Sequence, residues 1–282
     1  KMGRRTCAET VRTMLRLGFR SIDTAPTYKN EDKVGEALSG NTHTEVFVVA
    51  KVPKRATNAE QMREEFEKTL SALNKTSVDL LLLHWPSDVM SQNTLPEVWS
   101  SMEGLVRERK CRALGVCNFN EKALMRLLRL CTIPPVVNQV ERHPLLPQWR
   151  LLEVCSNHNV TVQAHTPLGG AQGNNSVLGD PAVRKVSDQT GLTPAQVVLR
   201  WNLQQEVPVV TKCSTEDHAR EILACVHGDA EDPDRASAWL APEHMQELDG
   251  IVLDEIDDTK RFVVPPFMYG KAVYCWGERM PR

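Results

Sequence analysis

The sequence contains no apolar run of the roughly 20 residues that a membrane-spanning helix needs, and it has no strong excess of charge of either sign. Lysine and arginine together number 34 against 36 aspartates and glutamates, which gives a formal net charge of -2. A balance this close to zero gives no support for binding to nucleic acid or to an anionic membrane. We therefore predict neither a nucleic-acid partner nor membrane association.

Two common motifs are also missing. None of the eight cysteines has a partner at C-x-x-C spacing, so we predict reduced thiols, which are typical of a cytoplasmic protein, rather than a disulfide framework. No G-x-G-x-x-G follows any predicted strand, so a Rossmann nucleotide-binding domain has no support. The opening residues Lys1-Met2-Gly3-Arg4-Arg5 do not have the pattern of a signal peptide.

Short β-rich runs alternate with longer amphipathic ones along most of the chain. The predicted strands are Ser21 to Asp23, Val46 to Lys51, Val78 to His84, Arg112 to Val116, Val136 to Glu141, Val160 to His165 and Val207 to Thr211. The predicted helices are Ala8 to Leu17, Glu31 to Leu38, Ala59 to Leu73, Leu95 to Arg109, Glu121 to Leu130, Leu151 to His158, Pro194 to Gln204, Asp217 to Cys225 and Pro242 to Gly250.

The strand pattern favours a barrel. Leu80 to Leu83 are all apolar, which indicates a strand buried on both faces, as in a parallel sheet covered by helices. Polar residues follow nearly every strand, and α/β barrels collect their active sites at that end of the strands. We predict a single (β/α)8 TIM-type barrel domain over residues 1–282. Its tail, about residues 251–282, is either a substrate-binding lid or a packed surface strap.

Four chemically active side chains follow three of the predicted strands. Asp23 ends the first strand, Tyr28 lies five residues further on, and Lys51 and His84 end the next two strands. A cation beside a tyrosine stabilises the phenolate that remains after proton donation. Asp23 can keep Lys51 charged, and His84 can hydrogen-bond the substrate oxygen. Each residue alone has an ordinary structural explanation, but together they predict a proton-donating site that needs no metal.

These four residues resemble the Asp, Tyr, Lys, His tetrad of the aldo-keto reductases. Further segments resemble the same family in the same order. They are Gly18-Phe19-Arg20-Ser21-Ile22-Asp23-Thr24-Ala25, Leu114-Gly115-Val116-Cys117-Asn118-Phe119, Val137-Asn138-Gln139-Val140-Glu141-Arg142-His143-Pro144 and Val209-Val210-Thr211-Lys212. The resemblance covers nearly the whole chain and implies reduction of an aldehyde or ketone with NADPH.

The resemblance also implies which residues bind the cofactor. Asn118 and Gln139, beside Cys117, would hold the nicotinamide carboxamide, and His165 would stack on the ring. The turn containing Thr166, Leu168 and Gly169 would lie along the pyrophosphate. Lys212, followed by Cys213 and His218, would meet the adenosine 2'-phosphate.

The chain departs from the family pattern at several of these positions. The family usually has Ser where Cys117 and Cys213 stand, commonly Tyr where His165 stands, and Arg where His218 stands. A lost guanidinium weakens phosphate recognition, so NADPH is the predicted cofactor and NADH use stays open. By comparison with the family, we also expect the chain to lack an N-terminal hairpin and the first barrel strand.

The substrate is predicted only as a small-molecule carbonyl compound, with Trp85 and Trp276 as candidate pocket residues. We predict a monomer. Two other functions stay open at this point. One is a noncatalytic cofactor-binding or partner-binding member of the family, which the departures motivate. The other is a lyase that forms a Schiff base on Lys51, although a neighbouring Asp23 would raise the pKa of that lysine and oppose the reaction.

Overall fold

A computed structural model of the chain describes residues 3–40, 45–169, 177–227, 239–252 and 261. Contacts divide the chain into two compact units, which we describe separately. The first holds the described residues up to Gln139 together with Cys155–Thr161. The second holds Val140–Val154 and the described residues from Val162 onward.

The first unit is built on parallel strands that are neighbours in their sequence order, β1-β2-β3-β4-β5. Its elements are α1 (Arg4–Leu17), β1 (Ser21–Asp23), the 3-10 turn η1 (Pro26–Tyr28), α2 (Glu31–Ser39), β2 (Phe47–Val52), α3 (Ala59–Leu73), β3 (Val78–Leu83), α4 (Ser87–Ser91), α5 (Leu95–Arg107), β4 (Cys111–Cys117), α6 (Glu121–Leu128) and β5 (Val137–Glu141), whose last two residues belong to the second unit.

Burial of both sheet faces holds these strands in place. In β3, Leu80 to Leu83 are all at most 3% exposed, which confirms the two-sided burial predicted from their unbroken apolar run. Gly115 in β4 allows a close approach of the neighbouring strands. A Cβ at that position would lie 2.6 Å from the Leu82 side chain and 2.8 Å from the carbonyl oxygen of Val137.

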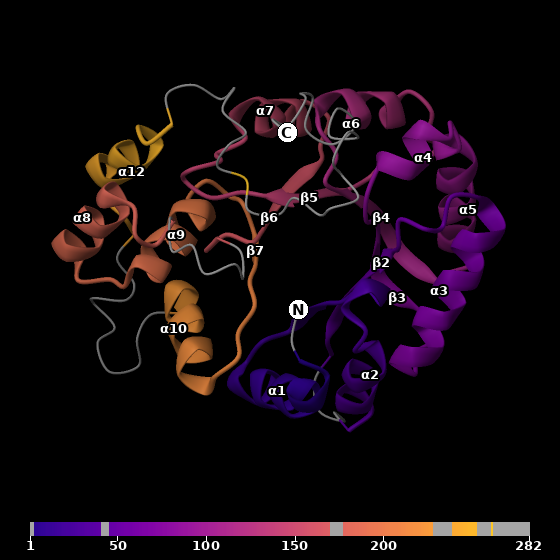
Figure 1. The fold of residues 1–282 in the computed structure, drawn as a ribbon, viewed down its shortest axis with the longest axis horizontal. Helices are drawn as coiled ribbons and strands as arrows, with labels where there is room; N and C mark the ends of the chain where they lie inside the picture. Colours follow the sequence, from indigo (N-terminus) through magenta and orange to yellow (C-terminus); the bar gives the residue numbers. More distant parts are fainter. Residues whose placement is uncertain (1–2, 41–44, 170–176, 228–238, 253–260, 262–282) are drawn as a thin grey trace. The chain divides into compact units, whose positions relative to one another are not determined.

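The helices of the first unit cover the sheet. Figure 1 shows α3 and α5 on the same side of strands β2 to β4, and α3 contacts both α2 and α5. The α3 helix has the predicted bounds. Asn58 caps it by accepting a hydrogen bond from the backbone N–H of Gln61, and Asn74 ends it in the left-handed conformation.

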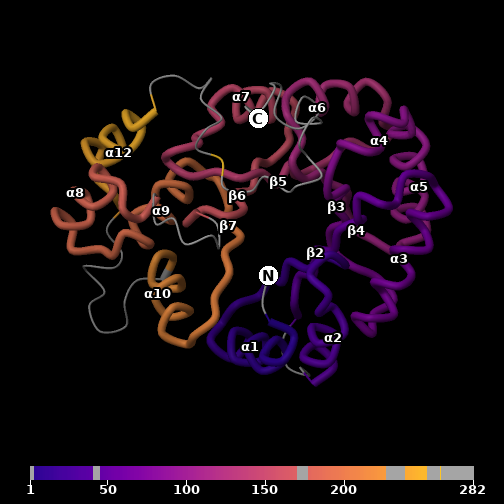
Figure 2. The backbone as a smooth tube through the Cα atoms, viewed as in Figure 1, coloured from indigo at the N-terminus to yellow at the C-terminus, as the bar shows by residue number. Residues whose placement is uncertain are grey.

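The second unit pairs β6 with β7 in parallel. Its elements are α7 (Trp149–Asn157), which ends in the first unit, β6 (Thr161–His165), α8 (Pro181–Thr190), α9 (Pro194–Leu203), β7 (Val209–Val210), α10 (Glu216–His227) and α12 (Pro242–Asp249). Helix α9 contacts α8 and α10, and α12 packs on α8 (Figure 2). A capping box between Thr193 and Gln196 starts α9.

The structure corrects the sequence prediction at three places. Helix α1 begins at Arg4 rather than Ala8. The prediction missed this first turn because Arg4 to Thr6 are exposed and show no apolar periodicity. Helices α4 and α8 were not predicted. The α8 helix has recognisable end signals, since Asp180 caps its start and Gly191 ends it. Among the described helices, none is both long enough and apolar enough to cross a membrane.

Candidate active site

The four predicted catalytic side chains lie together in the first unit. Asp23 is the last residue of β1, Tyr28 ends the turn η1, and Lys51 is the penultimate residue of β2. His84 directly follows β3, and its backbone N–H donates to the carbonyl of Val52 at 3.2 Å. Because these strands are parallel neighbours, their carboxyl ends meet at one edge of the sheet.

Lys51 is the centre of this group and is only 1% exposed. Its Nζ atom forms an ion pair with Oδ1 of Asp23 and lies 3.4 Å from the phenol oxygen of Tyr28, within hydrogen-bond range. Burial alone would lower the pKa of this ammonium group. The negative charge of Asp23 opposes that effect, and the Lys51 pKa lies above its ordinary value, so Lys51 is a cation at neutral pH.

Tyr28 is a neutral phenol in this setting. Burial raises its pKa above the ordinary value, Lys51 opposes that rise, and Asp23 adds to it. The imidazole of His84 meets the Tyr28 ring edge-on, with the ring centres 6.2 Å apart. The arrangement therefore presents a phenol that keeps its proton at neutral pH, with a cation beside it and an imidazole next to it.

Two amide side chains and a thiol extend this group. Gln139 donates from Nε2 to Oδ2 of Asp23 at 2.8 Å, and Asn118 donates from Nδ2 to the carbonyl of His84 at 3.1 Å. Asn118 has φ 63°, the left-handed conformation that asparagine tolerates well. The Cys117 thiol lies 3.7 Å from Oε1 of Gln139. Burial raises the pKa of this thiol to about 12, so it stays protonated.

Trp85, predicted as a pocket residue, is 7% exposed and stacks on His84 with the ring centres 5.8 Å apart and 22° between the planes. Its ring therefore restricts the orientation of the imidazole. Trp276, the other predicted pocket residue, lies outside the described residues.

The remaining predicted cofactor residues lie in the second unit. His165 ends β6 and its Nδ1 lies 3.0 Å from the hydroxyl of Thr166. Thr166 and Gly169 have φ values of 53° and 81°, so the turn that they bound follows a tight left-handed path. Leu168 in this turn packs against the apolar core of the unit.

The segment after β7 carries the residues predicted to meet the phosphate. Lys212 is exposed, whereas Cys213 is buried with its thiol 3.1 Å from the carbonyl of Thr215. His218 is exposed in the first turn of α10, and its backbone N–H donates to the Thr215 hydroxyl at 3.3 Å.

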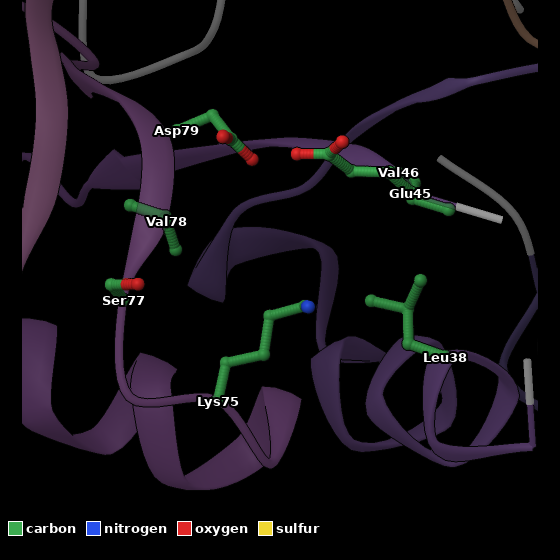
Figure 3. Close-up of a pocket in the computed structure, with 7 residues that line it drawn as sticks. All are labelled: Leu38, Glu45, Val46, Lys75, Ser77, Val78 and Asp79. Carbon is green, nitrogen blue, oxygen red and sulfur yellow. The ribbon is translucent and has the colours of Figure 1, made fainter. Parts of the chain in front are cut away.

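A separate pocket of about 260 Å³ lies at the amino ends of β2 and β3, away from the strand ends that carry Lys51 and His84. Figure 3 shows the polar side chains of Lys75, Glu45 and Asp79 directed into it. None of the predicted site residues lines it. Within the described ranges, the chain has no cluster of three or more His, Cys, Asp or Glu side chains that could hold a metal ion.

The sequence reasoning missed one buried acid near the site. Glu31 is 8% exposed and begins α2, three residues after Tyr28. A signal for its burial is present in the sequence, because Glu31 lies at helical spacing from Val34 and Leu38 and so on the apolar face of α2.

Comparison with known proteins gives a consistent result. The model of a family described as "Aldo/keto reductase family" matches residues 1–235. The chain is 35% identical to the 9,11-endoperoxide prostaglandin H2 reductase of Trypanosoma cruzi, covering 90% of this chain and 83% of that protein. It is 34% identical to the glyoxal reductase of Bacillus subtilis, covering 88% and 84% of the two.

A solved structure is also similar. The crystal structure of a Gox0644 mutant in complex with NADPH has a TM-score of 0.80 and 29% identity, and the match covers 94% of this chain and 89% of that one. Together with the parallel strands and intervening helices described above, these matches confirm the predicted (β/α)8 fold class.

Proposed function

Because the chain belongs to the aldo/keto reductase family and is therefore an oxidoreductase, we propose that it reduces an aldehyde or ketone to an alcohol with NADPH, and that Tyr28 supplies the proton. The bound cofactor supplies a hydride, which forms the new C–H bond at the carbonyl carbon. The O–H bond of Tyr28 breaks and its proton goes to the substrate oxygen, which leaves a phenolate on the protein.

The contact between Lys51 and Tyr28 is the observation that carries this proposal. A phenol is a weak acid at neutral pH, so proton donation is favourable only if the phenolate is stabilised as it forms. The Lys51 ammonium lies 3.4 Å from the phenol oxygen and has no water-exposed position to move to, since it is buried. A fixed cation in a site of low dielectric stabilises developing negative charge strongly.

The neighbouring groups keep this pair in place. Asp23 holds the Lys51 ammonium through the ion pair, and Gln139 holds the second oxygen of Asp23. His84 is packed between Tyr28 and Trp85. We assign to it the hydrogen bond that orients the substrate oxygen, because an imidazole next to the phenol can reach the same atom.

The residues of this chain fit a nicotinamide cofactor. A carboxamide needs one partner that donates and one that accepts, and an amide side chain can do both. The two amide side chains lie on neighbouring parts of the sheet. Asn118 directly follows β4, and Gln139 lies in β5, where it pairs in register with Cys117. In the second unit, the turn with left-handed Thr166 and Gly169 is assigned to the pyrophosphate, because a glycine there lets the backbone approach a phosphate closely. His165 is assigned to the nicotinamide ring.

We infer NADPH rather than NADH from the exposed ammonium group of Lys212, with His218 and Arg220 on the following helix. Lys212 attracts a 2'-phosphate as a point charge. Cys213 directs its thiol to a backbone carbonyl, so it is not assigned to the phosphate. The Gox0644 neighbour, crystallised with NADPH, supports the same cofactor.

The experiment that tests the proposal follows NADPH absorbance in the presence of the purified chain and a carbonyl compound. Para-nitrobenzaldehyde and glyoxal are suitable first substrates. The first is a reactive aldehyde, and the second is the compound after which the glyoxal reductase of Bacillus subtilis is named. We expect consumption of NADPH equal to the alcohol formed. Cofactor binding without turnover of either compound, in a folded preparation, would instead support a noncatalytic member of the family.

A further inference from the structure

The amide of Gln139 is connected to the proposed proton donor through a continuous chain of contacts. Its Nε2 atom donates to Oδ2 of Asp23 at 2.8 Å, whereas Oδ1 of the same carboxylate is paired with the ammonium of Lys51. That ammonium lies 3.4 Å from the phenol oxygen of Tyr28. All four residues belong to the first unit, so the chain of contacts lies within one compact body.

This chain of contacts is shielded from water. Gln139 is 2% exposed and Lys51 is 1% exposed, and the side chain of Asp23 is 9% exposed. Hydrogen bonds are electrostatically stronger in such surroundings than in water. An N–H group that points at a buried carboxylate therefore offsets part of its charge, and it also limits the directions in which the carboxylate can turn.

The contact with Asp23 fixes which way the Gln139 amide faces. A carboxylate accepts hydrogen bonds and does not donate them, so the amide must present its N–H group to Asp23. The Oε1 atom then faces Cys117, the register partner of Gln139 in β4, whose thiol lies 3.7 Å away. A thiol is a weak donor, so this oxygen is suited to accept a stronger hydrogen bond from the N–H group of a carboxamide.

Several groups set the acidity of Tyr28. Burial raises its pKa, Lys51 from β2 lowers it, and Asp23 from β1 and Cys117 from β4 raise it further. His84, which follows β3, meets the phenol ring edge-on. Because Asp23 and Lys51 act on the phenol in opposite directions, a donor that offsets the charge of Asp23 leaves more of the ammonium charge to stabilise a phenolate.

We propose that Gln139 is a positioning residue for proton donation, which holds the Asp23 carboxylate toward Lys51 and offsets part of its charge, and that the same amide presents Oε1 to the nicotinamide carboxamide. One side chain then serves both the cofactor and the proton donor. Without this amide, the charge of Asp23 counteracts Lys51 more strongly, and Tyr28 becomes a weaker acid. The inference rests on the proposed reduction of a carbonyl compound.

The test compares the full chain with Gln139→Met, which has a similar length but no amide, and with Asn138→Leu as the matched control. Asn138 is the preceding residue of β5. It is 0% exposed, and it donates to the carbonyl of Phe119 at 2.9 Å rather than to Asp23. Each variant loses one buried amide, so both should melt at a lower temperature than the full chain. Gln139→Asn, whose shorter amide loses the contact with Asp23, replaces Gln139→Met if that variant does not fold.

The acidity of Tyr28 can be measured without turnover. The sequence has only three tyrosines, so 3-fluorotyrosine labelling resolves them by fluorine NMR, and the signal missing from Tyr28→Phe identifies Tyr28. Fluorotyrosine is a stronger acid than tyrosine, which brings the titration to a lower pH. We expect the midpoint for Tyr28 to rise by about 0.5 to 1 pH unit in Gln139→Met, as loss of one hydrogen bond predicts. An unchanged midpoint, or an equal rise in Asn138→Leu, overturns the proposal.

Turnover gives an independent readout. At saturating NADPH, kcat of Gln139→Met should fall about twofold to tenfold, because a weaker acid donates its proton more slowly. The Kd for NADPH should also rise, whereas Asn138→Leu should keep both values. A higher Kd with unchanged kcat and an unchanged Tyr28 midpoint would confine Gln139 to cofactor binding and overturn its positioning role. A shifted midpoint in Gln139→Met, with no turnover by any of the proteins, would instead overturn the proposed reduction and support the link from Gln139 to Tyr28.

Discussion

The ammonium of Lys51 lies 3.4 Å from the phenol oxygen of Tyr28, while its ion pair with Asp23 fixes it from the other side. The two contacts come from residues far apart in the sequence, on β1, η1 and β2. They place a cation against the group that we propose as the acid, in a position where neither partner can be solvated freely.

The ion pair of Lys51 with Asp23 predicts a large stability effect. In Asp23→Asn the buried Lys51 ammonium loses its counter-charge, so the free energy of unfolding should fall by about 3–5 kcal/mol. Asp32→Asn is the matched control, because it removes an exposed pair with Arg4 and should change stability by about 1 kcal/mol or less. Urea unfolding of both variants checks this, and equal losses would contradict the buried character of the Lys51 pair.

The same pair predicts a pH dependence with a definite sign. The Lys51 pKa is raised in the folded chain, so its contribution to stability is fully present below the ordinary lysine pKa of about 10.4. It is lost only as the pH rises through the higher folded value. In Asp23→Asn, burial acts on Lys51 without the opposing charge of Asp23 and lowers its pKa. The variant should therefore regain stability as Lys51 loses its proton, and the difference in unfolding free energy between the full chain and Asp23→Asn should shrink from pH 7 to pH 9. A difference that is the same at both pH values would show that Lys51 stays charged without Asp23.

Much of this site could be predicted from the sequence because its residues follow β-rich runs. The ends of the runs at Asp23, Lys51 and His84 converge in a parallel sheet, and strand burial is visible in unbroken apolar stretches. Helix α3 was equally readable, because Asn58 caps a regular apolar spacing. The single-domain organisation, the monomeric state and the roles of the site residues stay predictions.

Other features depend on contacts that no local pattern reveals. The hydrogen bond from Gln139 to Asp23 joins residues 116 positions apart. The thiol of Cys117 could be expected near the amides, but its contact with Oε1 of Gln139 depends on side-chain orientation. Glu31 was overlooked because acids at the start of a helix are usually exposed and favourable there, and only the packing on α3 makes this one buried.

We predict that replacing the thiol of Cys117 with a hydroxyl strengthens cofactor binding. Cys117→Ser replaces a weak donor with a hydroxyl beside Gln139 and Asn118, so we expect NADPH to bind a few-fold more tightly, as one improved hydrogen bond contributes about 0.5–1.5 kcal/mol. Fluorescence quenching by NADPH measures this. The control is Cys111→Ser, which changes a buried thiol at the other end of β4, and a similar gain there would argue against a local effect.

We predict that Lys212 determines the preference of the protein for NADPH over NADH. Removing an ammonium that meets a phosphate loses about 1.5–3 kcal/mol, so Lys212→Ala should raise the KM for NADPH about tenfold or more. The KM for NADH should change little, because NADH lacks that phosphate. Lys122→Ala, which changes another exposed lysine, is the control. An equal change in the KM for NADPH and for NADH would show that Lys212 does not recognise the 2'-phosphate.

The most direct test of the account is turnover by Tyr28→Phe. The variant keeps the ring that packs against His84 but has no proton to donate. We predict that carbonyl reduction with NADPH falls roughly 100- to 10,000-fold, while NADPH quenches the fluorescence of the variant with an unchanged Kd. A Tyr28→Phe protein that binds NADPH and reduces para-nitrobenzaldehyde at the rate of the full chain would contradict the assignment of Tyr28 as the proton donor.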